Sequence, residues 1–82
     1  MSSTIQKLAL ASKRSRGLAK HQALEALGNH LKKISDDEYE KELMQIDDVR
    51  IFGQLYATGL SKERQILALR YWSGLVEALG GE

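Results

Sequence analysis

The chain has 82 residues, 43% hydrophobic and 28% charged, which is the composition of one folded domain and not of a disordered chain. It contains no cysteine, which excludes disulfides and Cys-based zinc sites and fits a reducing compartment such as the cytoplasm. The net charge is +1, yet Met1–Ile34 holds seven Lys or Arg against one acid, and Ser35–Glu82 holds ten acids against five bases. This division predicts either an electrostatic match between the two halves or a basic arm for an anionic partner.

Proline is absent and strand-forming residues are scattered, so little in the chain resists helix. No apolar run approaches the roughly 18 residues of a membrane span, and we expect no membrane partner. We therefore predict one all-α domain over residues 1–82. It is a compact bundle of four to five short helices with short connections, and it associates through helix faces.

Residues 1–16 are predicted to form a basic N-terminal helix or arm. Ser2, Ser3 or Thr4 can cap it, and Ile5 begins a short apolar stripe. The segment also has the composition of a mitochondrial transit peptide, although we favour a helix of the mature chain. The four basic residues of this segment, together with the next basic residue of the chain, are candidate contacts to nucleic acid or to an acidic partner: Lys7, Lys13, Arg14, Arg16 and Lys20.

A bend is predicted at Ser15–Gly17, because glycine costs about 1 kcal/mol inside a helix relative to alanine. A second helix follows to Ile34. Its leucines repeat with the 3-4-3 spacing of a packing seam, which makes them a candidate self-association face: Leu24, Leu27, Leu31 and Ile34. The repeat is too short to indicate an independent coiled coil.

The sharpest local signal is Ser35 followed by three acids. Ser35 at the N-cap and Glu38 three residues later match a capping box, with Ile34 and Tyr39 in staple positions. The acids are explained by the helix dipole rather than by metal binding. A helix begins here.

The apolar face shifts sharply after Ile46, which predicts a kink or break at Ile46–Asp48, with Asp47 as a fresh N-cap. The helix then resumes to about Thr58. Gly59 is expected just beyond its C-terminus, and Ser61 is expected to cap the next helix.

The last helix is predicted to end near Leu79, and residues 80–82 to fray. Its apolar arc spans about 200° and is interrupted only by Arg64 and Gln65. So wide an arc must lie between several elements or against a partner, and one side is a second candidate self-association face: Leu67, Tyr71 and Leu75. All five aromatic residues lie after residue 38, so we expect the core to be centred in the second half.

No constellation for catalysis, metal binding or a cofactor is recognisable. His21 and His30 do not share a helix face, and no nucleophile elbow or glycine-rich phosphate loop is present. We expect a protein that is not an enzyme and holds no cofactor or metal.

Two stretches bear on DNA binding. Gln54–Ser61 resembles the turn of a helix-turn-helix, with Gly59 at the turn glycine, although Gln65 stands where that motif buries an apolar residue. The run LSKERQILALRYWSGL, Leu60–Leu75, resembles the start of the fourth region of bacterial sigma factors over about a fifth of the chain. The sequence ends before the recognition helix of that family, so we do not carry its function over.

We expect a small helical regulator, adaptor or inhibitor that acts by binding another macromolecule, and a protein is the favoured partner. We also expect the protein to form a homodimer. The alternative is a DNA- or RNA-binding regulator that uses the basic N-terminal cluster. A homodimer would cover the apolar faces, whereas a monomeric bundle would bury them all internally.

Overall fold

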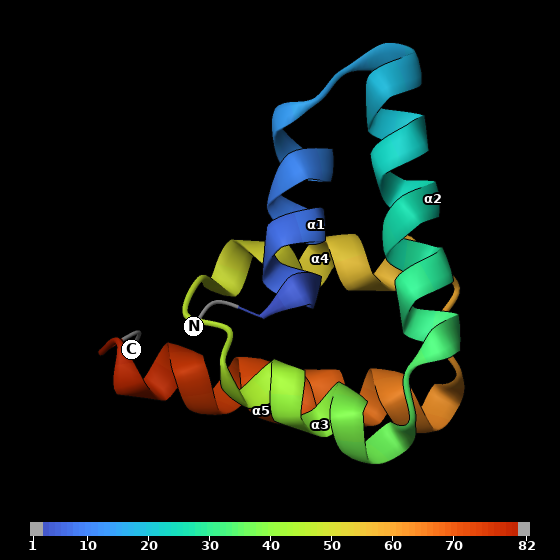
Figure 1. The fold of residues 1–82 in the computed structure, drawn as a ribbon. Coiled ribbons are helices and arrows are strands. Elements are labelled where there is room, and N and C mark those ends of the chain that lie inside the picture. Colours follow the sequence, from blue (N-terminus) through green and yellow to red (C-terminus); the bar gives the residue numbers. More distant parts are fainter. Residues whose placement is uncertain (1–2, 81–82) are drawn as a thin grey trace.

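Helices α1 (Thr4–Arg14) and α2 (Gly17–Lys33) form an antiparallel hairpin that stands across the remaining helices, as the computed structural model shows for residues 3–80 (Figure 1). The layer beneath the hairpin contains four further elements: α3 (Asp36–Met44), the short 3-10 helix η1 (Val49–Ile51), α4 (Phe52–Tyr56) and α5 (Lys62–Ala78). Within these residues there is no strand, and the predicted all-α bundle of four to five short helices is confirmed.

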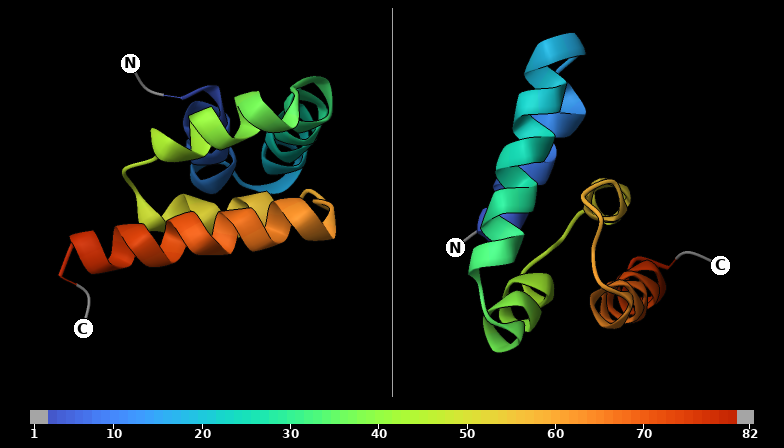
Figure 2. Two further views of the ribbon diagram at one scale, coloured as in Figure 1. Left: turned by 90° about the horizontal axis from the view of Figure 1, so that it is seen from below. Right: turned by 90° about the vertical axis from the view of Figure 1, so that its right-hand side faces the viewer.

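Figure 2 shows the layer from two further sides. The axes of α3, α4 and α5 are roughly aligned, and the hairpin crosses them. The open end of the hairpin packs on the layer, while the closed end, where α1 turns into α2, extends beyond it. None of the helices in residues 3–80 is long and apolar enough to cross a membrane.

Serine residues start three of the helices, as the sequence indicates. Ser3, Ser35 and Ser61 each accept, at the side-chain Oγ, the backbone N–H three residues later, at 2.9, 3.2 and 3.3 Å. Each bond satisfies one of the N–H groups that a helix start leaves without a partner. The cap at Ser35 is confirmed, but the Glu38 carboxylate accepts the Ser35 hydroxyl at 3.3 Å and not the backbone N–H that completes a capping box. The alternative cap Ser2 lies outside the described residues.

The breaks between helices also fall where the sequence places them. Gly17 and Gly59 adopt positive φ values of 61° and 76°, a conformation that side chains disfavour. The predicted break at Ile46–Asp48 is present, and α5 ends at Ala78, one residue before the predicted Leu79. The expected fraying of Gly81 and Glu82 lies outside the described residues.

The new N-cap after this break is Asp48 and not Asp47. The Asp48 carboxylate accepts the Arg50 backbone N–H at 2.9 Å. Asp47 is occupied elsewhere, because its carboxylate accepts the Gln6 side-chain Nε2–H at 2.8 Å and its backbone N–H donates to the Gln6 side-chain Oε1 at 3.0 Å. This paired contact ties α1 to the loop before η1.

The core draws on both halves of the chain, which corrects the expectation that it is centred in the second. Ile5 and Ala9 of α1 are fully buried, so the N-terminal helix packs into the centre. The same cluster contains side chains from every other element: Leu27, Leu31, Ile34, Tyr39, Leu43, Ile46, Ile51, Phe52, Leu55, Leu60 and Ala68.

Arg64 connects three elements at one point. Its guanidinium donates to the carbonyl oxygens of Leu31 and Ile34, at 2.6 and 2.9 Å, and to the Asp36 carboxylate at 3.0 Å. The first two acceptors belong to the end of α2, where the last carbonyl groups of a helix lack internal partners. Arg64 therefore caps α2 from the first turn of α5.

Candidate functional site

Helix α5 lies at the edge of the structure and leaves one long side uncovered. Only Ala68 of α5 is fully buried, whereas Ile66, Leu69 and Leu79 are 55%, 53% and 63% exposed. Trp72 on the same helix and Tyr56 on α4 are 39% and 42% exposed. We call this set the α5 face: Tyr56, Ile66, Leu69, Trp72 and Leu79.

The α5 face has the spacing of a packing seam. Leu69, Trp72, half-buried Val76 and Leu79 follow one another at intervals of three, four and three residues, which places them along one side of the helix. A cavity of about 340 Å³ opens between α4 and α5 beside this seam, and its walls are apolar or aromatic: Phe52, Gly53, Tyr56, Leu69 and Trp72. The Tyr56 hydroxyl donates to the Gln65 carbonyl oxygen at 3.1 Å and so fixes one wall.

The predicted face of α5 lies on an adjacent side of the helix, which turns toward the core. Leu67, Tyr71 and Leu75 are half-buried and pack against the protein's own core. The Tyr71 hydroxyl donates to the Glu40 carboxylate at 2.7 Å, and this bond raises the pKa of the hydroxyl. That side of α5 is therefore largely occupied by α3.

The predicted leucine seam of α2 turns inward. Leu27, Leu31 and Ile34 belong to the core of the single chain and present almost no surface. Leu24 is half-buried and lines a cavity of about 300 Å³ between α2 and the end of α4. A 3-4-3 spacing marks a face that needs a neighbour, but it does not say whether that neighbour belongs to the same chain.

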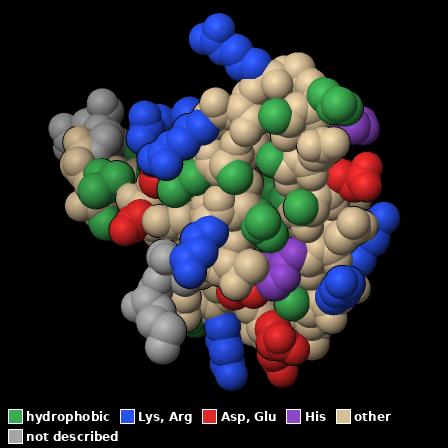
Figure 3. Space-filling view, turned by 45° about the horizontal axis from the view of Figure 1, so that its top comes forward, with side chains coloured by type: hydrophobic (Ala, Val, Ile, Leu, Met, Phe, Trp, Pro, Cys, Tyr) green, Lys and Arg blue, Asp and Glu red, His purple; other side chains and the backbone are tan. Residues whose placement is uncertain are grey.

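The closed end of the hairpin gathers four predicted bases: Lys13, Arg14, Arg16 and Lys20, which we call the basic hairpin end. The first three are exposed and Lys20 is half-buried, while exposed Lys7 lies further along α1. Arg16 also occupies the N-cap of α2 without providing a side-chain acceptor, so the first N–H groups of α2 add positive potential. Figure 3 turns this end partly toward the viewer, and Lys and Arg side chains project from this face.

None of these five bases forms an ion pair within residues 3–80, although Lys13 lies near enough to Asp48 for its charge to help lower the pKa of that carboxyl group. The ion pairs of residues 3–80 join His30 to Glu42, Arg50 to Asp48, and Arg64 to Asp36. The charge imbalance between the two halves of the chain is therefore not resolved by direct contacts of the N-terminal bases.

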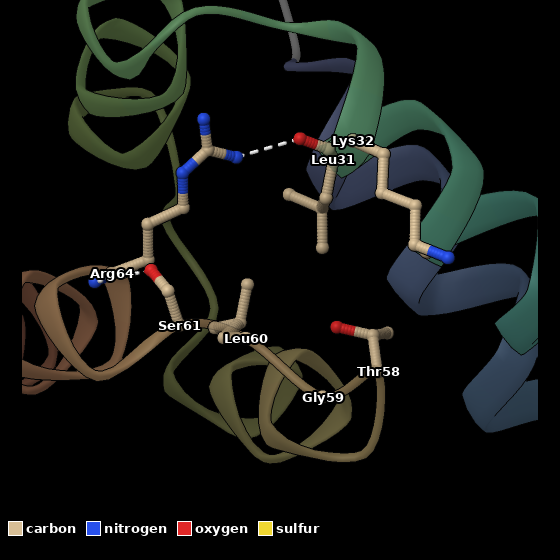
Figure 4. Close-up of a pocket in the computed structure, with 8 residues that line it drawn as sticks. Leu31, Lys32, Thr58, Gly59, Leu60, Ser61 and Arg64 are labelled. Carbon is tan, nitrogen blue, oxygen red and sulfur yellow. Dashed lines mark hydrogen bonds between the residues drawn. The ribbon is translucent and has the colours of Figure 1, made fainter.

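The pocket in Figure 4 lies between the end of α2 and the turn that joins α4 to α5. Leu31 and Leu60 form its apolar floor, and its volume is about 260 Å³. Three of its polar side chains have partners: Arg64 holds the end of α2, Ser61 caps α5, and the Thr58 hydroxyl donates to the Leu55 carbonyl oxygen at 2.7 Å. The pocket is thus a packing junction in which no nucleophile faces a base.

The histidines lie apart. His30 bonds through Nε2 to the Glu42 carboxylate at 2.9 Å, while the other oxygen of Glu42 accepts the Ile5 N–H at 2.8 Å. His21 is exposed near the basic hairpin end. In residues 3–80 no three His, Asp or Glu side chains gather closely enough to hold a metal ion.

The segment that resembles a helix-turn-helix has a different arrangement. Helices α4 and α5 run side by side in opposite directions, as the two views of Figure 2 show, whereas the helices of that motif cross at roughly 90–120°. Gln65 also has a local role here, because its amide donates to the Leu60 carbonyl oxygen at 2.9 Å.

Comparison with known proteins gives no relative: no family model, no curated protein and no solved structure matches this chain.

Proposed function

We propose that this protein is a non-enzymatic binding module that acts through the α5 face and pairs there with a second copy of itself. The observation that carries the proposal is the apolar stripe of Leu69, Trp72 and Leu79, which residues 3–80 leave 39–63% exposed. Contiguous apolar surface of this kind marks interaction sites, whereas scattered exposed apolar residues are ordinary. The setting we propose is the cytoplasm, to which a chain without cysteine is suited.

A second copy fits the face because the spacing of the stripe is symmetric about Gly74. Antiparallel pairing about a two-fold axis near Gly74 sets Leu69 of each copy against Leu79 of the other, and Trp72 against Val76. Trp72 then lies near the centre of the interface, where aromatic side chains contribute most to binding energy.

The test is the oligomeric state in solution. Sedimentation velocity over a range of protein concentrations should show a dimer of the wild type. Leu69→Glu with Trp72→Glu should give a folded monomer, because four charges at the centre of the interface would have no partners. Circular dichroism confirms that the variant is folded.

Leu18→Glu with Met44→Glu is the matched control. Both residues are exposed, at 71% and 62%, and neither belongs to the α5 face, since Leu18 lies on α2 and Met44 borders the side of α5 that carries Tyr71 and Leu75. The control should remain a dimer. A wild type that is monomeric at millimolar concentration would overturn the proposed pairing, as would equal loss of the dimer in both variants.

A further inference from the structure

We infer that the basic hairpin end is a binding site for the phosphate backbone of nucleic acid, distinct from the α5 face. It is formed by Lys13, Arg14, Arg16 and Lys20, with Lys7 extending it along α1. The inference does not rest on self-association, and the two sites lie on different elements.

The first argument is that these charges are available. Arg14 and Arg16 are exposed and belong to none of the ion pairs of residues 3–80. The first acid of the chain is Glu25, two turns into α2, so the closed end carries bases without interspersed acids. A group of like charges gains free energy when it meets a polyanion, and it releases the counterions condensed on that polyanion.

The second argument is position. The closed end extends beyond the layer formed by α3, α4 and α5, so a long partner can approach this end from outside that layer (Figure 1). Lys7 and Arg14 lie seven residues apart, so they share one face of α1 and are separated by about 10.5 Å along its axis. Their long side chains can therefore reach phosphates of the same backbone.

The third argument separates nucleic acid from other anionic partners. Leu18 is the one large apolar side chain strongly exposed at this end within the described residues, and no aromatic residue lies in α1 or α2. Membrane-surface helices need a broader apolar or aromatic face, and protein interfaces are depleted of lysine at their centre. Phosphate contacts need no apolar or aromatic face and favour lysine and arginine, so the chemistry fits a nucleic acid bound without sequence preference.

Fluorescence anisotropy with a labelled 20-base-pair duplex of random sequence tests the site. For four or five phosphate contacts the affinity of the wild type should fall about 150- to 500-fold between 50 and 200 mM salt. Arg14→Gln with Arg16→Gln should weaken binding at low salt and make the slope of log K against log salt shallower by about 1.8. A duplex RNA of the same length shows whether DNA or RNA supplies the backbone.

The matched control is Lys33→Gln with Lys41→Gln, which removes the same charge from exposed positions at the other end of the hairpin and on α3. It should leave the slope unchanged. Equal weakening by both variants would mean a response to net charge and would overturn the site. Absence of binding at 50 mM salt would overturn it too, as would binding only to vesicles that contain anionic lipid. The variant Leu69→Glu with Trp72→Glu should still bind the duplex, so the two proposals fail independently.

Discussion

Tyr39 and Arg64 contact each other through two separate interactions. The Tyr39 hydroxyl donates to the Arg64 backbone carbonyl oxygen at 2.8 Å, and the Arg64 guanidinium lies 4.8 Å from the centre of the Tyr39 ring. This contact fixes the first turn of α5 against α3, while the same guanidinium caps α2. The orientation of the α5 face therefore depends on one arginine near the start of the helix.

Replacing Arg64 by lysine should destabilise the protein by about 2–3 kcal/mol, although the charge is kept. A lysine ammonium has no planar fork and cannot reach both carbonyl oxygens and the Asp36 carboxylate together. Urea unfolding followed by circular dichroism measures the loss. Arg70→Lys, at an exposed position of the same helix, is the control and should change stability by less than about 0.5 kcal/mol. Equal urea midpoints for the Arg64 and Arg70 variants would show that the planar guanidinium of Arg64 is not needed for stability.

Alkaline pH should weaken the same contact. Burial raises the pKa of the Tyr39 hydroxyl from 10.0 to about 12, against the opposing effect of the Arg64 charge. Because the hydroxyl ionises more readily in the unfolded chain, its contribution to stability is complete below pH 10 and is lost as the pH rises toward 12. Unfolding midpoints measured from pH 8 to 11.5 should fall more steeply for the wild type than for Tyr39→Phe. If the unfolding midpoints of both proteins fell in parallel with pH, the loss of stability would be due to titration of lysine residues and not of Tyr39.

Local patterns predicted the helix boundaries because the causes of those boundaries are local. Ser35 finds its partner Glu38 within the same turn, and Gly59 adopts a backbone conformation that its own lack of a side chain permits. The partners of Arg64 are different: the Leu31 and Ile34 carbonyl groups are 33 and 30 positions away. On the helical wheel Arg64 only interrupts an apolar arc, and nothing in that periodicity identifies the helix end that it caps.

The sites were harder to predict than the helices because they, like the contacts of Arg64, depend on residues that are distant in the sequence. The leucines of α2 and the apolar residues of α5 were both recognised as faces that need a neighbour. Leu27 is covered by the chain itself and Leu69 is not, a difference that depends on how the helices pack. The basic cluster could be recognised from its charges alone, and it remains a candidate binding site because the structure leaves Arg14 and Arg16 exposed.

Asp48 should titrate at unusually low pH. Hydrogen bonds from the Arg50 side chain and backbone lower the pKa of the Asp48 carboxyl group from 3.8 to about 2. The contribution of this group to stability is therefore complete above pH 4 and is lost as the pH falls toward 2. Carboxyl carbon shifts followed by NMR should give a midpoint near 2 in the wild type and a value closer to 4 in Arg50→Gln. A wild-type midpoint near 4 would contradict the contact.

Two glycines should respond oppositely to the same substitution. Gly59→Ala forces a side chain into a φ of 76° and should cost about 1–2 kcal/mol. Gly74→Ala, inside α5 with no atom within 4 Å of the added carbon, should stabilise the protein by about 0.4–1 kcal/mol. Thermal unfolding of the two variants measures both effects. A Gly59→Ala variant as stable as the wild type would mean that the turn before α5 adopts another conformation.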